Sequence, residues 1–295
     1  MTDVRHSLRR ELALVRVAGS DARQFLHAQT TQDIDRLGLN ETRFAAWLSP
    51  KGRVQALFDV VPAGDSFWLI TPADNADWLT ERLRLFVLRA DVQLEVVAEP
   101  VVHSLTGNTR AWLHDRAIDL GVGGVVHRDG LLWIRIGEAI VDAIGPSEQL
   151  AELFADIPAA DSDVAIGQEI AAGRPALPAA LRDRYIPQML NLDLLDAISF
   201  TKGCYPGQEI VARTENLGQV KRRMYRFGVA DGVKPVPGDA IVDDAARTAG
   251  EVVRSITRDG GFELLAVIQI DAAGRRLELA SDGRALEQLP LESEG

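Results

Sequence analysis

The chain is poor in cysteine, because its 295 residues include only Cys204. A single thiol excludes an intramolecular disulfide and any zinc site built from several thiolates, and it is typical of a reducing compartment. Long apolar runs are also missing: no stretch approaches the roughly 18 uncharged residues that a membrane-spanning helix needs. The first ten residues carry basic side chains with no apolar segment behind them, so no signal peptide is predicted. We therefore expect a cytoplasmic protein without a membrane partner.

Positive charge is scarce as well. The chain has 32 Lys and Arg residues against 43 Asp and Glu residues, which leaves a formal net charge of −11. This charge repels nucleic acid unless a local basic patch reverses it, so direct nucleic-acid binding is disfavoured. The five histidines show no metal-ligand spacing, and no Gly-x-Ser-x-Gly motif is present. No metal site is predicted, and hydrolase chemistry is disfavoured.

The order of strand-like and helix-like segments indicates three domains. Through residue 218 the two kinds of segment mix without a regular βαβ rhythm, which favours α+β layers over a doubly wound sheet. After Gly218 short strands follow at even spacing with Gly, Asp and Pro between them, as in a small antiparallel barrel. We predict two mixed α+β domains, residues 1–100 and 101–218, and a C-terminal β-barrel, residues 219–295.

The segment around the single cysteine is the most distinctive. Pro206 suits the first position of a helix that would continue through Arg213. Cys204 would then lie just before a helix N-terminus, where free backbone N–H groups and the positive end of the helix dipole favour a thiolate. Lys202 adds a positive charge nearby, so nucleophilic or redox chemistry is available to the thiol. The alternative is a buried cysteine that only fills space in a core.

Five segments of the sequence resemble the YgfZ branch of the glycine-cleavage T-protein superfamily. In chain order they are FLHAQTTQD at residues 25–33, AAWLSPKGR at 45–53, YIPQMLNLD at 185–193, KGCYPGQE at 202–209 and AGEVVRS at 249–255. The resemblance covers nearly the whole chain. It implies three domains around a central opening that holds tetrahydrofolate or another reduced folate, with the N-terminal domain as the folate-binding one. It also implies a role in assembling or repairing iron–sulfur proteins, associated with tRNA modification, in which iron–sulfur carriers or client enzymes are the partners.

Residue by residue, the resemblance makes Cys204 the functional thiol and Lys202 its catalytic neighbour. Side chains at matching or nearby positions are candidates for binding the folate: Tyr205, Gln208, Glu209, Arg213, Glu169 and Arg53. A carboxylate at Glu169 suits pterin N–H groups because it accepts two hydrogen bonds side by side. Tyr205 could stack on a planar heterocycle, and Arg53 could meet the acidic tail of a folate.

Structural alternatives exist for most of these candidates. Gln208 and Glu209 could simply cap the helix and interact with its dipole, and Tyr205 could be a packing residue. Glu169 could be an exposed helical glutamate, and Arg53 could be solvated.

One departure from the superfamily concerns the reaction. Its aminomethyltransferases carry paired aspartates in the strand after a Gly-rich turn, and counting from Gly52 these positions hold Ala56 and Leu57, which cannot exchange a proton. Asp59 lies two or three residues further on, where an odd shift would turn it to the other strand face. We therefore expect a thiol-dependent maturation factor rather than a classical aminomethyltransferase. A folate-dependent one-carbon transferase and a folate-sensing binding module remain open alternatives.

Overall fold

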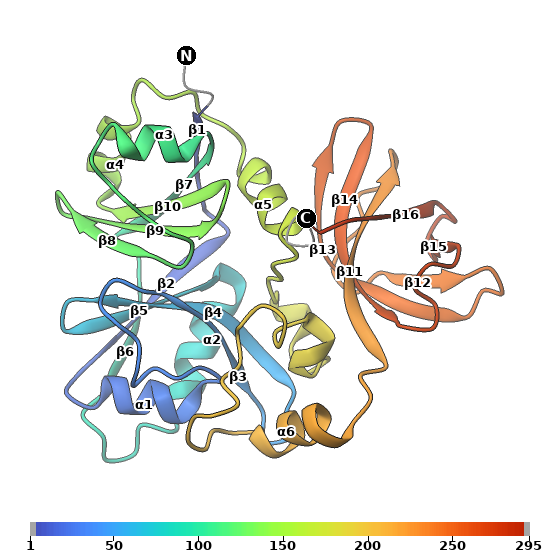
Figure 1. Ribbon diagram of the computed structural model, residues 1–295, viewed down its shortest axis with the longest axis horizontal. Helices are drawn as coiled ribbons and strands as arrows, with labels where there is room; N and C mark the ends of the chain where they lie inside the picture. Colours follow the sequence, from blue (N-terminus) through green and yellow to red (C-terminus); the bar gives the residue numbers. More distant parts are fainter. Residues whose placement is uncertain (1–3, 292–295) are drawn as a thin grey trace.

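The computed structural model describes residues 4–291, which form two five-stranded antiparallel sheets and a closed six-stranded barrel (Figure 1). The first sheet has the strand order β3-β4-β5-β2-β6. Its strands are β2 (Leu12–Ala18), β3 (Arg43–Leu48), β4 (Val54–Ala63), β5 (Ser66–Pro72) and β6 (Gln93–Val97). Two helices, α1 (Ala22–Gln29) and α2 (Ala73–Arg84), cover one face of it and bury a core that includes Leu26, Phe58 and Leu79.

The second sheet has the order β1-β7-β10-β9-β8. Its strands are β1 (Val4–Leu8), β7 (Val101–Gly107), β8 (Val125–Arg128), β9 (Leu131–Gly137) and β10 (Ile140–Gly145). The helices α3 (Thr109–His114) and α4 (Ser147–Leu153) pack on it through a core that contains Trp112, Trp133 and Phe154. The first strand of the chain therefore pairs with β7 in the second sheet and not with the strands that follow it in sequence.

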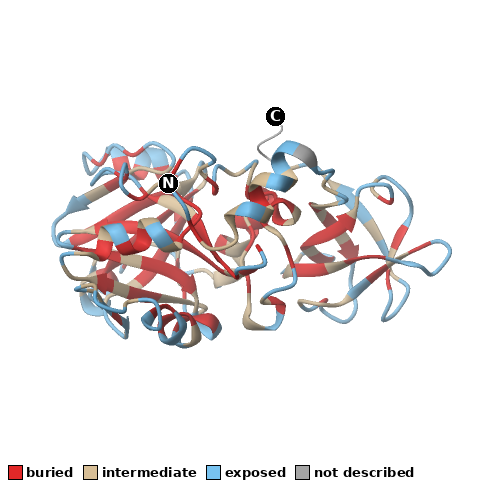
Figure 2. Ribbon diagram, turned by 90° about the horizontal axis from the view of Figure 1, so that it is seen from below, coloured by how far each residue is buried: buried red, intermediate tan, exposed pale blue. Residues whose placement is uncertain are grey.

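The inner faces of the two sheets pack on each other. Alternate residues of β2 and β5 in the first sheet and of β9 and β10 in the second form this inner core, for example Leu14, Ile70, Ile134 and Ile144. Residues that alternate with them, such as Val15 and Trp133, face the outer helices, as the period of two in a strand requires. The result is a four-layer arrangement of helices, sheet, sheet and helices, and Figure 2 shows its buried interior on the side away from the barrel.

The barrel follows a long connection and has the closed order β11-β14-β13-β12-β15-β16. Its strands are β11 (Arg222–Ala230), β12 (Ala240–Asp243), β13 (Thr248–Arg258), β14 (Gly261–Gln269), β15 (Leu277–Leu279) and β16 (Ala285–Leu289). The connection contains α5 (Ser162–Ala171), the 3₁₀ turns η1 (Ala179–Leu181) and η2 (Pro187–Leu190), and α6 (Gln208–Leu217).

One core joins the first sheet, the connection and the barrel. It combines Leu57 of the first sheet, Leu190 and Tyr205 of the connection, and Val253 and Leu265 on the outside of the barrel. The α5 helix also contacts both the second sheet and the barrel strands β13 and β14. The predicted α+β fold class with a C-terminal antiparallel β-barrel is confirmed.

Candidate functional site

Cys204 is exposed and lies in a loop before α6. This helix begins at Gln208, two residues later than the sequence predicts, so Pro206 is in the preceding turn and not at the first helical position. Gly207 takes the N-cap position with a φ of 79°, a left-handed conformation that glycine adopts without steric cost. The alternative of a buried, space-filling cysteine is therefore wrong.

Segments that are distant in the sequence meet around this loop. A Cβ atom on Gly207 would lie 2.6 Å from the carbonyl oxygen of Ser49 and 2.8 Å from the Cα atom of Gly52. The end of α1 joins the same region, because the Thr31 hydroxyl accepts a hydrogen bond from the Ala46 amide at 2.9 Å. Residues 25–33, 45–53 and 202–209, three of the five segments that carry the family resemblance, thus form one structural unit.

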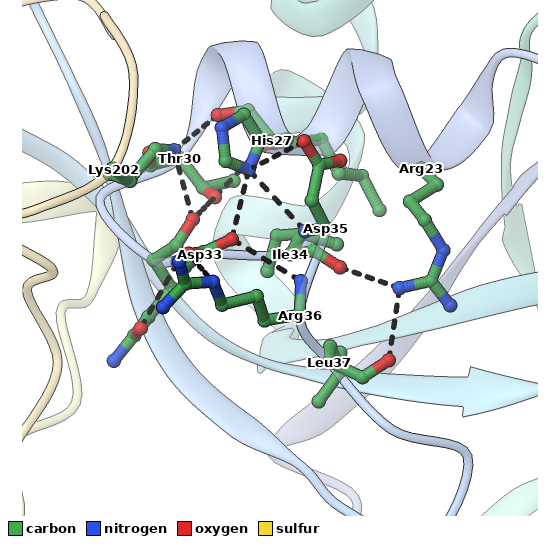
Figure 3. Close-up of polar contacts among 11 residues, drawn as sticks. Arg23, His27, Thr30, Asp33, Ile34, Asp35, Arg36, Leu37 and Lys202 are labelled. Atoms are coloured by element: carbon green, nitrogen blue, oxygen red, sulfur yellow. Dashed lines mark hydrogen bonds and ion pairs between the residues drawn. The ribbon is translucent and has the colours of Figure 1, made fainter.

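Lys202 links the cysteine loop to the end of α1. Its ammonium group donates hydrogen bonds to the carbonyl oxygens of His27, Thr30 (2.7 Å) and Gln32 (2.9 Å), and its side chain is buried (Figure 3). Burial lowers the pKa of Lys202 to about 8, although the nearby carboxylates of Asp33 and Asp35 oppose this shift. All three N–H groups of the ammonium therefore point at main-chain oxygens.

Tyr205 follows Cys204 but points inward. It is buried in the core that joins the first sheet to the barrel, and burial raises the pKa of its hydroxyl to about 12. The Lys202 Nζ atom lies 5.1 Å from the centre of the Tyr205 ring, within the range of a cation–π interaction. Lys202 and Tyr205 are therefore both anchored in the interior, and the exposed thiol of Cys204 lies between them in the sequence.

A polar cluster that the sequence analysis did not select lies against this loop. His27 Nδ1 is 3.4 Å from a carboxylate oxygen of Asp33 and 3.5 Å from one of Asp35, and it accepts a hydrogen bond from the Asp35 amide (Figure 3). The other ring nitrogen, Nε2, faces Gly203, whose Cβ position lies 3.7 Å away. His27 and Asp33 belong to the segment 25–33 that resembles the family, which is the signal that could have selected them.

The remaining candidates near Cys204 are on the surface of the same region. Glu209 and Arg213 are exposed on α6, and Gln208 is half-buried at its start. Arg53 is half-buried in the turn beside α6, where its guanidinium donates to the carbonyl of Arg184 at 2.8 Å. Their roles in binding a ligand stay predictions.

Glu169 lies apart from this group, on α5, and it is buried rather than exposed. Its carboxylate forms ion pairs with two guanidinium groups, that of Arg9 in the β1–β2 turn at an N···O distance of 3.0 Å and that of Arg254 in the barrel at 2.5 Å. Burial alone would raise the pKa of Glu169, but the charges of Arg9, Arg254 and Arg174 outweigh it and lower the pKa to about 2. The alternative of an exposed helical glutamate is therefore wrong.

Two further carboxylates belong to this central cluster. Arg174 donates to both oxygens of Asp59 at 2.6 Å, while Ser104 donates to Asp142 at 2.5 Å and accepts from Arg9 at 2.8 Å. Burial raises the pKa of Asp59 against the opposing charge of Arg174, and it raises the pKa of Asp142 to about 6. Arginines therefore balance these carboxylates in a buried network between the two sheets and the barrel.

Asp59 lies on the same face of β4 as Leu57, as a shift of two residues requires. Together with Leu57 it lines a cavity of about 40 Å3 where the two sheets, α5 and the barrel converge. An aspartate therefore does face the centre of the molecule, two residues beyond the nearer of the expected positions. Its carboxylate is occupied by Arg174, whose guanidinium also lies 3.9 Å from the centre of the Phe44 ring.

The central cavity opens next to a larger groove. The cavity is too small for a pterin ring, since a single water already needs roughly 10–15 Å3 of such space. The adjoining groove has a volume of about 430 Å3 and shares Leu12, Pro72, Ala176 and Arg254 with the cavity. Its other walls are mostly apolar, with Ile166, Pro178, Pro235, Val236, Pro237 and Val253, and they also include the charged residues Glu11, Asp74 and Lys234. Sites for drug-sized ligands usually have about 300–1,000 Å3, mainly apolar walls and a few polar groups.

A larger hollow lies elsewhere. It measures about 780 Å3, is situated where the β4–β5 turn approaches the β8–β9 turn, and is lined by residues such as Trp68, His127 and Glu148. None of the residues that the sequence analysis selected lines it. Size alone therefore does not identify the functional site in this molecule.

The fold is that of the glycine-cleavage aminomethyltransferases. The structure superposes on aminomethyltransferase T of the glycine cleavage system from Bartonella henselae with a TM-score of 0.78, covering 98% of this chain and 86% of that one at 18% sequence identity. No family model matches the sequence.

Sequence comparison finds relatives of the YgfZ type. The chain is 29% identical over 270 residues to the tRNA-modifying protein YgfZ of Vibrio vulnificus, covering 86% of this chain and 81% of the relative. It is 26% identical over 266 residues to the protein of the same name from Aliivibrio fischeri, covering 88% and 83%. Over most of its length the chain is thus similar to proteins of the YgfZ type, and it shares the fold of the T-protein. Within residues 4–291, no helix is long and apolar enough to cross a membrane.

Proposed function

We propose that this protein is a cytoplasmic, tetrahydrofolate-binding factor that assists the assembly or repair of iron–sulfur proteins, with Cys204 as its functional thiol. One observation carries the proposal: the single cysteine is exposed on a loop that is fixed on both sides by buried anchors. A cysteine that served only packing would be expected inside the core. An exposed thiol on a rigid support is suited to contact a partner protein or a reactive small molecule.

The folate part of the proposal is supported by the groove beside the central cluster. Its volume of about 430 Å3 suits the pterin and aminobenzoyl parts of a reduced folate. Ile166, Val236 and Val253 would hold the rings from the sides, and Glu169 and Arg254 supply polar groups at the point where groove and cavity meet. Because Arg9 and Arg254 already bind the Glu169 carboxylate, a pterin N–H group would have to share it with them.

The iron–sulfur part rests on ligand number. Iron–sulfur clusters are normally held by about four protein ligands, so one thiol cannot hold a cluster alone. The partner, an iron–sulfur carrier or client enzyme, would provide the other ligands. The relatives are named as tRNA-modifying proteins, and we propose that the link to tRNA is through an iron–sulfur client that acts on tRNA. The net charge of −11 disfavours direct contact between this chain and RNA.

The test of the thiol is a Cys204→Ser variant in cells that lack the wild-type protein. We expect normal amounts of folded protein but loss of iron–sulfur client activity to the level of the deletion. Client activity at the wild-type level would contradict the proposal. Retained folate binding in that variant, together with full client activity, would instead support a folate-sensing binding module.

The test of the groove is calorimetric titration of tetrahydrofolate into purified protein. We expect Val236→Trp to weaken binding at least tenfold, because the indole would fill the groove. Val233→Trp is the matched control, since this valine is exposed and does not line the groove. Equal affinity in both variants would exclude the groove as the folate site.

A one-carbon transferase is the second candidate, and the position of Asp59 on the cavity-facing side of β4 is the observation that favours it. Turnover of methylene-tetrahydrofolate that is lost in Asp59→Asn would establish this alternative. We expect no turnover, because Arg174 occupies both carboxylate oxygens.

A further inference from the structure

The contacts of the Lys202 ammonium group are main-chain carbonyl oxygens at the end of α1 and just beyond it. Its three acceptors are the carbonyl of His27, in the last turn of α1, and those of Thr30 and Gln32 just beyond it. We propose that Lys202 is a positioning residue: its ammonium fills a three-carbonyl cage at the C-terminal end of α1 and thereby fixes the loop that presents Cys204. The proposal depends on the proposed function only for the role of the thiol.

The geometry explains why a lysine is needed. The last carbonyl groups of a helix have no partner inside the helix and carry partial negative charge, so they favour a cation. A lysine ammonium is compact and has three donors, which matches three converging carbonyl oxygens. The planar guanidinium of arginine presents its donors in a flat fork and does not fit the same arrangement.

The cage is the last of several contacts between the segment before Cys204 and the segment at the end of α1. The Thr31 hydroxyl donates to the carbonyl of Ala197 at 2.7 Å, and the Ser199 amide donates to the carbonyl of Thr31 at 2.8 Å. The Gln32 side-chain amide donates to the carbonyl of Asp196. Residues 196–202 therefore lie along residues 27–32, and Lys202 is the final anchor before the exposed thiol, two residues further on.

Charges around the cage keep the ammonium protonated despite its burial. Asp33 and Asp35, in the segment after α1, act in its favour, while burial acts against it. His27 contacts the same two carboxylates, and Arg36 lies 3.5 Å from Asp33 (Figure 3). On the other side lies the ring of Tyr205. A group engaged by three carbonyls and covered in this way is poorly placed to exchange protons with a substrate.

Chemical rescue tests the cage directly. In Lys202→Ala we expect hydrogen exchange of the Ser199 amide, measured in the full-length protein, to accelerate at least tenfold because the loop loses its final anchor. Propylammonium chloride should restore most of the protection by refilling the cage, whereas tetramethylammonium chloride at equal concentration, which has no N–H donor, should not. Lys221→Ala, at an exposed lysine, is the matched control and should exchange as wild type.

The outcomes separate a positioning role from a catalytic one. Wild-type exchange at Ser199 in Lys202→Ala, or equal rescue by both ammonium salts, would overturn the proposal, whatever happens to iron–sulfur client activity. Conversely, the cage would stand if Ser199 loses and regains protection while Cys204→Ser leaves client activity intact, and only the proposed function would fail.

A measurement on the wild-type protein covers the case in which Lys202→Ala does not fold. With ¹⁵N-labelled lysine, the Lys202 ammonium signal should be protected from solvent exchange and should titrate near pH 8, as expected for its lowered pKa. A Lys202 signal that exchanges with solvent as fast as that of the exposed Lys221 would show that the cage does not exist.

Discussion

Gly207 and Gly52 lie in direct backbone contact, with a Cβ position on Gly207 only 2.8 Å from the Cα atom of Gly52. Both residues have positive φ angles, 79° and 68°. This contact joins the start of α6 to the turn between β3 and β4, so it sets the position of the Cys204 loop relative to the first sheet. No side chain fits between the two segments.

Replacing Gly207 by alanine should therefore destabilise the protein by about 2–6 kcal/mol, since backbone strain and overlap with a backbone that cannot move each cost about 1–3 kcal/mol. The free energy of unfolding in urea measures the effect. Gly274→Ala is the matched control: its φ is 81° but nothing lies within 4 Å of its Cβ position, so only the strain should remain. Equal losses in the two variants would mean that the Gly207 contact is unimportant.

Glu169→Gln should destabilise the protein by about 3–5 kcal/mol, because it leaves the buried charges of Arg9 and Arg254 without their shared counter-charge. Urea unfolding again provides the measurement. The control is Glu251→Gln, whose ion pair with Arg184 also joins the barrel to the connecting segment but is partly exposed. That change should cost less than about 1 kcal/mol, and a similar loss in both variants would argue against a special role for the buried pair.

Asp142→Asn should alter how stability depends on pH. The pKa of Asp142 is about 6 in the folded protein against 3.8 for the ordinary carboxyl, so the folded state holds its proton more tightly than the unfolded state does. The contribution of the Asp142 carboxyl to the free energy of unfolding is therefore fully present below about pH 4 and is lost as pH rises through about 6. The wild type should lose about 2–3 kcal/mol relative to Asp142→Asn between pH 4 and pH 7. Parallel stability curves for the two proteins would contradict this assignment.

Tyr205→Phe should keep both stability and client support, whereas Tyr205→Ala should cost about 3–5 kcal/mol through the cavity it leaves in the shared core. The reason is that Tyr205 is buried with Leu57, Leu190 and Val253 and acts through its ring. Thermal unfolding and client activity measured together check the prediction. Loss of activity in a fully stable Tyr205→Phe would instead assign a chemical role to the hydroxyl.

Much of the architecture follows from local sequence patterns. Strand-like alternation and Gly-rich turns predicted the mixed layers and the terminal barrel, because side-chain period and turn chemistry are properties of neighbouring residues. The start of α6 was placed two residues too early because proline is a common first helical residue, whereas here Gly207 provides the cap that permits contact with Gly52.

The single cysteine and its motif were also recognisable in the sequence, and so was Glu169. Their surroundings were not, since Lys202 meets Thr30 across 172 residues and Arg9 meets Glu169 across 160. No local period encodes such contacts, because they arise only when the sheets, the connection and the barrel pack together. The sequence by itself determined the fold class and the position of the thiol, while the tertiary structure decided that Lys202 is anchored to α1 and that Asp59 and Glu169 are held by arginines.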